Sequence, residues 1–377
     1  MTEPIRNRSE ILFLYDVTEA NPNGDPLEIN RPRVDPDTGH NLVTDVRLKR
    51  TVRDYLIEER GYDGNENSPG DVFVREIMMP KGGIQDGKTR GKQFGGDTVE
   101  LKANVTAKCI DVRLFGATIP MAEDSVTLTG PVQFRLARSL NRVEVFHIKG
   151  TGAFASEAGA KQATFREEDF VHYSLIPFYG AINPIAAKDT LMTDDDEALL
   201  LEALWFGTKH LHSRSKLGHA PRLLLKINYE ESSSFIGELQ RHLKLNLREG
   251  LVSDKDIRSV DDYTVAIDSL IEQIRLAQNG ETPFGKRVTV ASIQVAHDPA
   301  LRLTVDEQLL EKSNQKSSHK ENAEVRVEPP PHVERDQKDK GSEADKLQVI
   351  SSLKETLEKA LGVEVFELTV PEVAHDE

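Results

Sequence analysis

The sequence contains one cysteine, Cys109, among 377 residues. A single thiol excludes an internal disulfide and a metal site built from several cysteines, and it is typical of a reducing compartment. We interpret Cys109 as a small buried residue. The chain also lacks any apolar run of membrane-span length, and its opening MTEPIRNRSE carries no apolar signal core. These absences predict a cytoplasmic protein without membrane contact.

The serine and histidine residues form no nucleophile motif. His210 and His212 lie two positions apart near an expected helix end, so they do not share a helix face. The sequence therefore predicts no cofactor and no bound metal.

Acidic residues outnumber basic ones, 63 Asp plus Glu against 48 Lys plus Arg, and the formal net charge is -15. This balance argues weakly against nucleic-acid binding, because cations must neutralise the phosphates. The net charge is a sum over the whole chain, however, whereas binding depends on local fields. Whether the chain can bind nucleic acid therefore depends on where its basic residues lie.

The first part of the chain predicts a strand and then a helix. Residues 10–17, EILFLYDV, form a near-continuous apolar run that predicts a central strand covered on both faces. Phe13 and Tyr15 are therefore interpreted as core residues, with base stacking as the alternative. After a turn-rich loop, Thr44 or Asp45 can cap a helix. The apolar side chains at helical spacing behind this cap are Leu48, Val52, Tyr55 and Leu56.

The middle of the chain predicts an insertion and an arm. Residues 61–98 are rich in Gly, Asn, Asp and Pro and predict irregular structure, after which ELKANVTAKCIDVRLFGAT returns to a helical pattern. Strands are predicted within 127–140 and 170–182. They bracket residues 141–169, so we expect a long hairpin arm that projects from the body.

The second half predicts two further helices. Residues 194–212 begin with three aspartates at the positive end of the helix dipole. The basic turn SRSKLGHAP and the buried strand RLLLKINY follow. Residues 254–279 are predicted as one helix, with Tyr263 on its buried face and Gly280 at its end, and residues 287–295 as a strand.

The last part of the chain differs in composition. Residues 312–346 balance acids with bases and contain almost no apolar residues, so they predict a disordered linker. Residues 347–377 predict a short amphipathic helix and a strand. These two elements either dock on the body or bind a partner.

The order of the expected elements indicates a fold class. Strand, helix, strand, arm, strand, helix and strand correspond to the β-α-β-β-α-β order of a ferredoxin-like or RNA-recognition-motif core. We predict an α+β fold of this kind with a helical and loop insertion and a long β-hairpin thumb. The expected segments are 1–60 for the first strand, loop and helix of the core, 61–115 for the insertion, 116–135 for the core, 136–170 for the thumb and 171–311 for the core and a C-terminal extension.

Basic residues gather where the first helix begins. Arg47, Lys49 and Arg50 oppose the positive end of the helix dipole, which is unfavourable for an isolated helix. A phosphate bound there would reverse the argument, because the free amides, the dipole and the side chains would all face one negative group. The alternative is that these side chains, together with Arg53, only solvate an outer face.

Several motifs resemble those of one family. They are LYDVTEANPNGDP followed by NRPRVDPDTGHNLVTDVRLKRTVRDYL, then IDVRLFGAT, TGPVQF with ARS close behind, YSLIPFYGAINP and FGTKHLHSRSKLGHAPRLLLKINY. Together they are similar to the backbone subunit of type I CRISPR interference complexes (Cascade) in the RAMP superfamily. The resemblance is nearer to the I-B and I-C branch than to the I-E branch.

The resemblance implies a protein without nuclease activity that binds CRISPR guide RNA along its backbone and stacks on copies of itself, with each thumb folded over the guide. The implied partners are the guide RNA, further copies of the chain, the other Cascade subunits and, through the guide, target DNA. Residues 81–96, a glycine-rich basic loop, either touch that DNA or form a mobile surface loop. The RNA-binding residues that the resemblance implies are Asn21, Asn23, Arg31, Arg33, Thr44, Arg47, Lys49, Arg50, Arg53, Arg135, Arg138, Phe146, His147, Lys149, Phe165, Arg166, Arg214, Ser215 and Lys216.

A metal-dependent RNA endonuclease is the alternative function. In the related type III backbone subunits an aspartate in the loop after the first strand cleaves target RNA, and the loop of this chain contains Asp25, Asp35 and Asp37. Paired carboxylates can hold Mg²⁺ and activate water. The sequence DPDTG is also a plain turn sequence, however, so the scaffold function is preferred.

Overall fold

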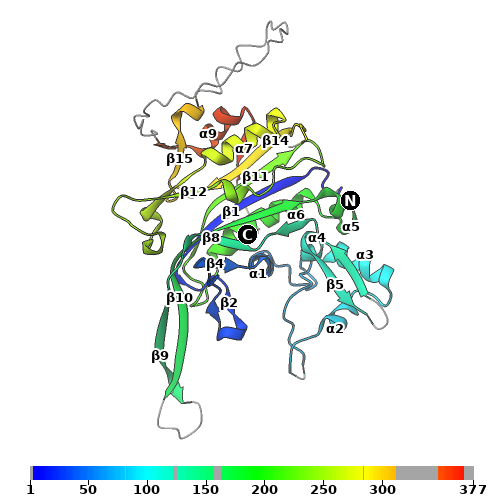
Figure 1. Cartoon of the computed structure of the whole chain (residues 1–377). Helices are drawn as coiled ribbons and strands as arrows, with labels where there is room; N and C mark the ends of the chain where they lie inside the picture. Colours follow the sequence, from blue (N-terminus) through cyan, green and yellow to red (C-terminus); the bar gives the residue numbers. More distant parts are fainter. Residues whose placement is uncertain are drawn as a thin grey trace, which may run out of the picture.

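The computed structural model describes residues 3–80, 82–121, 125–155, 163–282, 284–310 and 347–368, and at 151–155, 163–166 and 347 it describes the backbone only. The chain is a mixed α+β structure built around one seven-stranded sheet, with the order β17-β14-β11-β1-β10-β7 and with β9 paired to β10. Figure 1 shows this sheet and the arm that descends from it. Within the described residues, no helix is long and apolar enough to cross a membrane.

The main sheet contains the strands that the apolar runs predicted. All neighbouring strands pair antiparallel except β14 and β17, which are parallel. Its strands are β1 (Ser9–Ala20), β7 (Val132–Phe134), β9 (Val145–Ala155), β10 (Ala163–Ile182), β11 (His219–Tyr229), β14 (Val290–His297) and β17 (Val365–Glu367).

Strand β1 lies between β10 and β11 and is covered on both faces, as predicted. Side chains of a strand alternate between its two faces. Phe13 and Tyr15 belong to one buried cluster, whereas Leu12 and Leu14 belong to the other. All four are nearly inaccessible to solvent, which confirms that Phe13 and Tyr15 are core residues.

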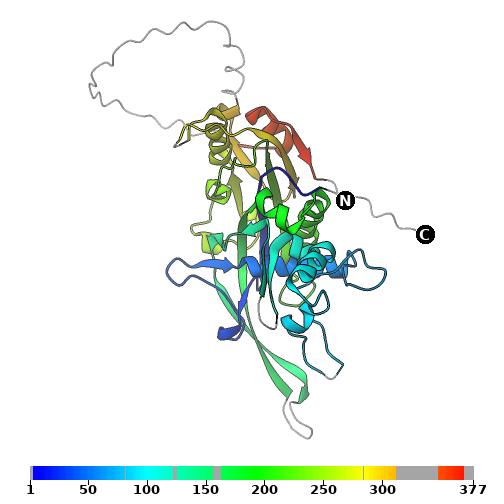
Figure 2. The same ribbon diagram turned by 90° about the vertical axis from the view of Figure 1, so that its right-hand side faces the viewer.

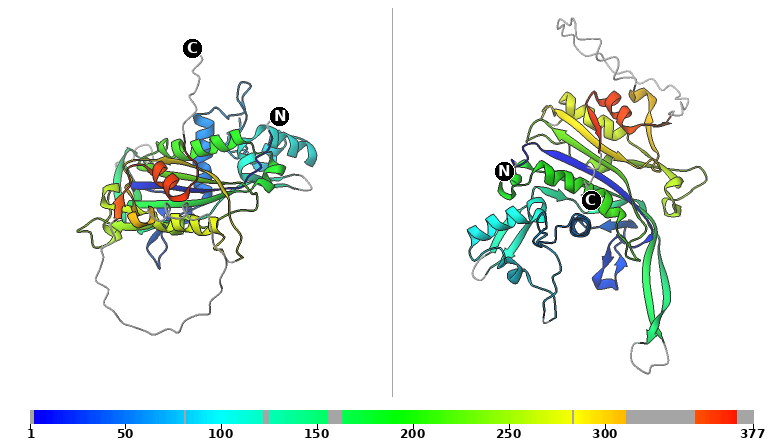
Figure 3. Two further views of the ribbon diagram at one scale, coloured as in Figure 1. Left: turned by 90° about the horizontal axis from the view of Figure 1, so that it is seen from above. Right: turned by 180° about the vertical axis from the view of Figure 1, so that it is seen from behind.

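One face of the sheet is covered by helices. Helix α1 begins after its cap Thr44, whose hydroxyl accepts a hydrogen bond from the backbone of Arg47, and it buries the predicted apolar stripe. Figure 3 shows α6 from behind, lying along this face. The helices of this layer are α1 (Asp45–Glu58), α4 (Ile110–Phe115), α5 (Pro184–Thr190) and α6 (Asp194–Lys209).

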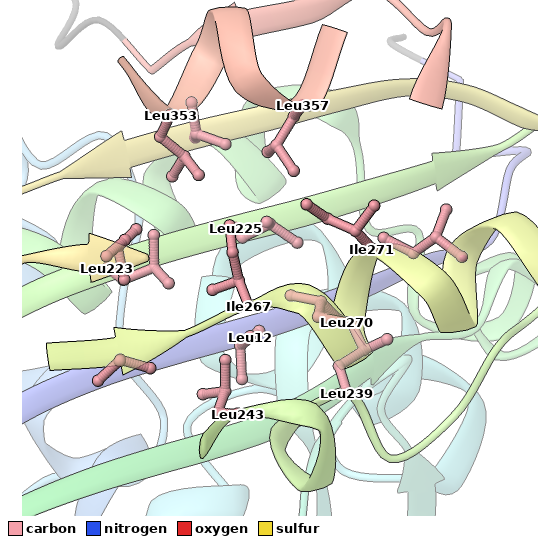
Figure 4. Packing of buried hydrophobic residues seen from close by; sticks show 14 of the residues in the cluster. Leu12, Leu223, Leu225, Leu239, Leu243, Ile267, Leu270, Ile271, Leu353 and Leu357 are labelled. Carbon is pink, nitrogen blue, oxygen red and sulfur yellow. The ribbon is translucent and has the colours of Figure 1, made fainter. Parts of the chain in front are cut away.

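The opposite face is covered by a second sheet with the order β12-β13-β15-β16 and by two helices. Figure 4 shows Leu223 and Leu225 of β11 facing Ile271 and Leu357 of the two helices across this core. The elements of this layer are β12 (Lys244–Leu247), β13 (Tyr263–Ala266), β15 (Leu303–Asp306), β16 (Leu347–Val349), α7 (Asp268–Asn279) and α9 (Leu353–Leu361).

The prediction of a single helix over 254–279 is wrong in its first half. Tyr263 belongs to strand β13, and α7 begins only at Asp268. Pairing of β13 with β12 and β15 overrides the helical spacing, because strand structure depends on partners elsewhere in the chain. The predicted helix end is confirmed, since Gly280 has a φ of 79° at the C-cap.

The insertion has a small core of its own. Leu101, Val105 and Cys109 are fully buried in it, as expected for Cys109. The cluster also includes Val126 and Leu128 of β6, so the packing of the insertion continues past the boundary expected at 115. Its elements are α2 (Gly87–Gly91), α3 (Thr98–Lys108), β5 (Gly116–Pro120) and β6 (Ser125–Thr129).

The arm is the hairpin of β9 and β10, and it projects from the body in both Figure 1 and Figure 2. Strand β8 (Ala137–Arg142) lies outside it, although the thumb was expected from 136, because β8 pairs instead with β4 (His40–Val43). Residues 156–162, between β9 and β10 in the chain, lie outside the described residues.

The end of the chain docks on the body, which was one of the two alternatives. Leu353 and Leu357 of α9 are buried in the second core, and β17 extends the main sheet. Strand β16, which the sequence did not predict, extends the second sheet. The predicted linker 312–346 lies outside the described residues.

Candidate nucleic-acid interface

The loop after β1 and the basic turn after α6 form one hydrogen-bonded unit. The backbone N–H of Asn21 donates to the carbonyl of Ser215 over 2.8 Å. The ammonium of Lys216 in turn donates to the carbonyls of Asn21 and Pro22. Residues almost two hundred positions apart therefore meet beside the end of β1.

The same loop also fixes the start of α1. The amide oxygen of Asn23 accepts from the hydroxyl of Thr44 over 3.0 Å, and that hydroxyl accepts from the backbone N–H of Arg47. Asn21 and Asn23 are only 2% and 6% exposed. Their burial favours a role in holding the loop rather than in direct contact with RNA.

Arg47 and Lys216 are two neighbouring, partly buried cations. Within the described residues neither forms an ion pair with a carboxylate. Burial lowers the pKa of Arg47, and burial together with the charge of Arg47 lowers the pKa of Lys216 to about 7. Two adjacent cations without an ion-pair partner near the amide end of a helix are suited to bind an anion.

The other basic residues near this site are exposed or engaged in ion pairs. Lys49 contacts Asp45 at 3.0 Å in a partly buried pair, and Arg50 contacts Asp54 at 2.6 Å in a more exposed one. The Arg50 pair can exchange partners at little cost, because solvent screens it. Arg31 is exposed on β3 (Arg31–Pro32), Arg33 contacts Asp25 at 2.9 Å, and Arg138 contacts Asp35.

The prediction that Arg53 faces outward is wrong. Arg53 is 9% exposed, and its Nε donates to Asp111 of α4 over 2.9 Å. Asp111 has no solvent exposure, and it also accepts from the backbone N–H of Phe73. A buried carboxylate requires a cation or several donors, which is why Arg53 turns inward.

Three of the predicted arm residues have described side chains. Phe146 stacks on His172 with ring centroids 4.2 Å apart. His147 contacts Asp169 at 3.0 Å, and Lys149 contacts Glu167 at 2.9 Å. The side chains of Phe165 and Arg166 on β10 lie outside the described residues.

Arg214 links the basic turn to the arm, since its guanidinium contacts Glu168 of β10 at 3.0 Å. Arg135 belongs to neither group. It precedes β8 and pairs with Glu238 in the loop before β12. The loop, the helix start, the basic turn and the arm root therefore come together, while Arg135 and Arg53 lie apart from them.

Two of the three loop carboxylates of the endonuclease alternative form ion pairs with arginines. Asp25 contacts Arg33, and Asp35 contacts Arg138, whose hydrogen bond lowers the pKa of Asp35 to about 2. Asp37 is exposed. In the part of the chain that the structure describes, no group of three or more His, Cys, Asp or Glu side chains could hold a metal ion.

Comparison with known proteins identifies the family. The family described as CRISPR-associated protein Cas7 matches residues 7–268, which include the loop, helix α1, the arm and the basic turn. The chain belongs to the Cas7 family. A Haloferax volcanii protein described as CRISPR-associated protein Cas7 is 35% identical over 300 residues, which cover 73% of this chain and 85% of that protein.

Two solved structures are similar in outline to this Cas7 chain. A chain of a "CRISPR RNA-guided surveillance complex, pre-nicking" is 12% identical with a TM-score of 0.46, and the match covers 78% of this chain and 93% of that one. A chain of a "CRISPR RNA-guided surveillance complex" is 14% identical with a TM-score of 0.44, over 78% and 90% of the two chains.

Sequence reasoning missed His219 of the Cas7 chain. His219 is 7% exposed, its ring stacks on Tyr15 with centroids 5.7 Å apart, and its Nδ1 bonds the carbonyl of Lys216 at 2.6 Å. Burial, together with the charges of Lys216 and Arg47, lowers its pKa to about 3. A signal was present, because this histidine lies within the basic turn SRSKLGHAP directly before a buried strand.

Proposed function

We propose that this Cas7 chain is a backbone subunit of a type I CRISPR interference complex (Cascade), a cytoplasmic assembly in which it binds guide RNA and does not cleave it. The observation that carries this proposal is the pair Arg47 and Lys216, two partly buried cations that no carboxylate neutralises in the described part of the chain. A phosphate is the anion that RNA offers to such a site.

We propose a ferredoxin-like core for this subunit. The strands β11, β1, β10 and β7 are neighbours and antiparallel throughout, and α1 and α6 contact each other on one face. This is the arrangement expected for a β-α-β-β-α-β chain, with the insertion between α1 and β7 and the arm before β10.

Phosphate binding at this site does not depend on the RNA sequence. The hydroxyl of the cap Thr44 accepts from only one backbone N–H of the first turn of α1, and the dipole of the helix adds to the charges of Arg47 and Lys216. A bound phosphate would keep Lys216 protonated despite its burial. A subunit that must hold any guide needs contacts of this kind, because phosphates carry no base identity.

The arm contributes a second set of contacts in this proposal. Phe146 offers an aromatic face, and the ion pairs of His147 and Lys149 lie on the exposed surface of the hairpin. Arg214 holds the basic turn against the arm. A guide strand that leaves Arg47 and Lys216 would therefore meet the arm next, in keeping with a thumb that folds over the guide.

The test is to purify the chain from cells that carry a matching CRISPR array and the other complex subunits, and to sequence the RNA that co-purifies. Uniform repeat-spacer guides are expected from the unchanged protein. The variant Arg47→Gln plus Lys216→Met should lose them, whereas Lys286→Met, which removes an exposed remote lysine, should not. RNA of random origin, or none, would overturn the proposal.

A further inference from the structure

The hairpin between β2 (Gly24–Asp25) and β3 exposes two large aliphatic side chains. Leu27 is 94% exposed and Ile29 is 85% exposed. Figure 1 shows this hairpin beneath α1, on the side of the body to which the arm also projects. Two apolar side chains that stand in water at the tip of a short hairpin point to a contact outside the chain.

The backbone of this tip is strained at Ile29. Ile29 has a φ of 52° and Asn30 a φ of 60°. The left-handed region is uncommon for any residue except glycine, and for a β-branched residue such as isoleucine it is a true outlier. Residues held in this way concentrate at functional sites. The turn geometry alone would favour glycine at position 29, so the isoleucine side chain must matter.

The tip is also rigidly held. Asp25 caps the single turn Pro26–Glu28 by accepting from the backbone N–H of Leu27 over 3.0 Å. The backbone N–H of Asn30 donates to the carbonyl of Asp25 over 2.8 Å. The backbone that carries the two aliphatic side chains is therefore held by hydrogen bonds within the hairpin.

The tip is connected directly to the cation site. The side-chain amide of Asn21 donates to the carbonyl of Asn30 over 2.6 Å, and the carbonyl of Asn21 accepts from Lys216. Arg31, the next residue after Asn30, is exposed. Strand β3 also contacts β10, the strand that continues into the arm. The apolar tip thus lies next to the two cations at which we place an RNA phosphate.

The chemistry of the tip favours bases over phosphates. Glu28, between Leu27 and Ile29 in the chain, is exposed and would repel a phosphate. Bases carry apolar faces, and proteins insert leucine or isoleucine between successive bases while nearby cations hold the backbone. We propose that Leu27 and Ile29 form an apolar wedge that contacts bases of the RNA strand whose phosphate lies at Arg47 and Lys216. This inference rests on the proposed function.

The first test is photocrosslinking in the complete complex. The photocrosslinker p-benzoylphenylalanine replaces Leu27, and in a control it replaces Phe284, which is 98% exposed in the loop after α7. Irradiation should join position 27 to RNA, and position 284 should give no RNA adduct. A protein adduct alone at position 27, or no adduct in a complex that carries guide RNA, would overturn the wedge and leave the proposed function intact. A complex without RNA would overturn both.

The second test removes the side chain without disturbing the backbone. Ile29→Gly relieves the strained conformation, and Leu191→Gly is the matched control, because Leu191 has a φ of 63° and is 47% exposed at the end of α5. Dimethyl sulfate probing of the guide in each purified complex should show changed base reactivity at regularly spaced positions with Leu27→Ala plus Ile29→Gly. It should show no change with Leu191→Gly. Unchanged reactivity in the first variant would overturn the proposal.

Discussion

Arg53 and Asp111 form a buried ion pair that joins the middle of α1 to α4, with the Nε of the arginine 2.9 Å from the carboxylate. The guanidinium also lies over the ring of Phe115, 5.3 Å from its centroid. This pair separates the basic residues of α1 into two groups. Arg53 holds the insertion against the core, whereas Arg47 lies beside Lys216 at the proposed phosphate site.

Arg53→Ala is expected to destabilise the protein by about 3–5 kcal/mol, because Asp111 would stay buried without its cation. Arg50→Ala is the matched control on the same helix, and it removes only an exposed pair worth about 0–1 kcal/mol. Chemical denaturation followed by circular dichroism measures both values. Equal losses in the two variants would contradict the structural role of Arg53.

Lys216→Met is expected to weaken RNA binding by about tenfold or more, because a charge-assisted phosphate contact contributes on the order of 1.5–3 kcal/mol. The salt dependence of binding should also fall. For single-stranded RNA the slope of log K against log salt decreases by about 0.7 for each phosphate contact removed. Titration of labelled RNA at several salt concentrations tests both effects, and an unchanged slope would exclude Lys216 as a phosphate ligand.

The pKa of Lys216 makes RNA binding dependent on pH. The pKa is about 7 in the free protein because of burial and Arg47, so Lys216 loses its proton as the pH rises above 7. Binding of a phosphate must then restore the proton, and affinity should fall by up to about tenfold for each pH unit above 7. Titrations at pH 6 and pH 8.5 should differ for the unchanged protein and much less for Lys216→Met.

The same pKa affects stability with the opposite sign. Between pH 7 and the ordinary lysine value of 10.5, the unfolded chain binds more protons at Lys216 than the folded chain does. The free energy of unfolding therefore rises with pH across this window. Lys216→Met removes this titration but also the hydrogen bonds to the carbonyls of Asn21 and Pro22, so its stability relative to the unchanged protein should be greatest at pH 7 and should fall toward pH 10. A stability difference between the two proteins that is the same at pH 7 and pH 10 would contradict the lowered pKa of Lys216.

His219 should make the fold sensitive to acid. Its pKa is about 3 in the folded protein, against 6.5 ordinarily, so the unfolded chain takes up the proton first as the pH falls through this range. Stability is then lost progressively from pH 6.5 to pH 3. His219→Phe keeps a ring against Tyr15 and should reduce this loss. Unfolding midpoints of the two proteins at pH 4 and pH 7 provide the comparison.

The endonuclease alternative makes a separate prediction. A complex that holds its guide should leave complementary RNA intact in the presence of Mg²⁺, because Asp25 and Asp35 are each bonded to an arginine. Gel analysis of labelled RNA measures this directly. Cleavage that disappears in Asp35→Ala or in Asp25→Ala would instead establish a nuclease.

Local sequence patterns were sufficient to predict the elements whose apolar residues form a long run or recur at a regular spacing. The run at 10–17 predicts β1, the spacing of Leu48, Val52 and Leu56 predicts α1, and Gly280 marks the end of α7. The start of α7 was missed for a physical reason. Tyr263, on the short strand β13, has helical spacing to Ile267, and only the pairing of β13 with β12 and β15 makes this segment a strand.

The sequence could predict which residues belong to the candidate site, but not which role each of them has. The sequence brings forward Arg47, Arg53 and Lys216 alike, because each is a basic residue within a motif that carries the family resemblance. Their difference lies in partners that are remote along the chain, such as Asp111, which is 58 positions beyond Arg53. Which cation lacks a counter-charge is decided only when the chain has folded.

Strand β10 runs without interruption for 20 residues from the arm into the centre of the sheet. At Val171 it passes from pairing with β9 to pairing with β1, and no loop separates the two halves. The arm is thus a continuation of a central strand rather than a segment attached through a flexible loop. A force on the arm is therefore passed directly to β1 and β11. In a row of such subunits, the stiffness of the central sheets would oppose bending.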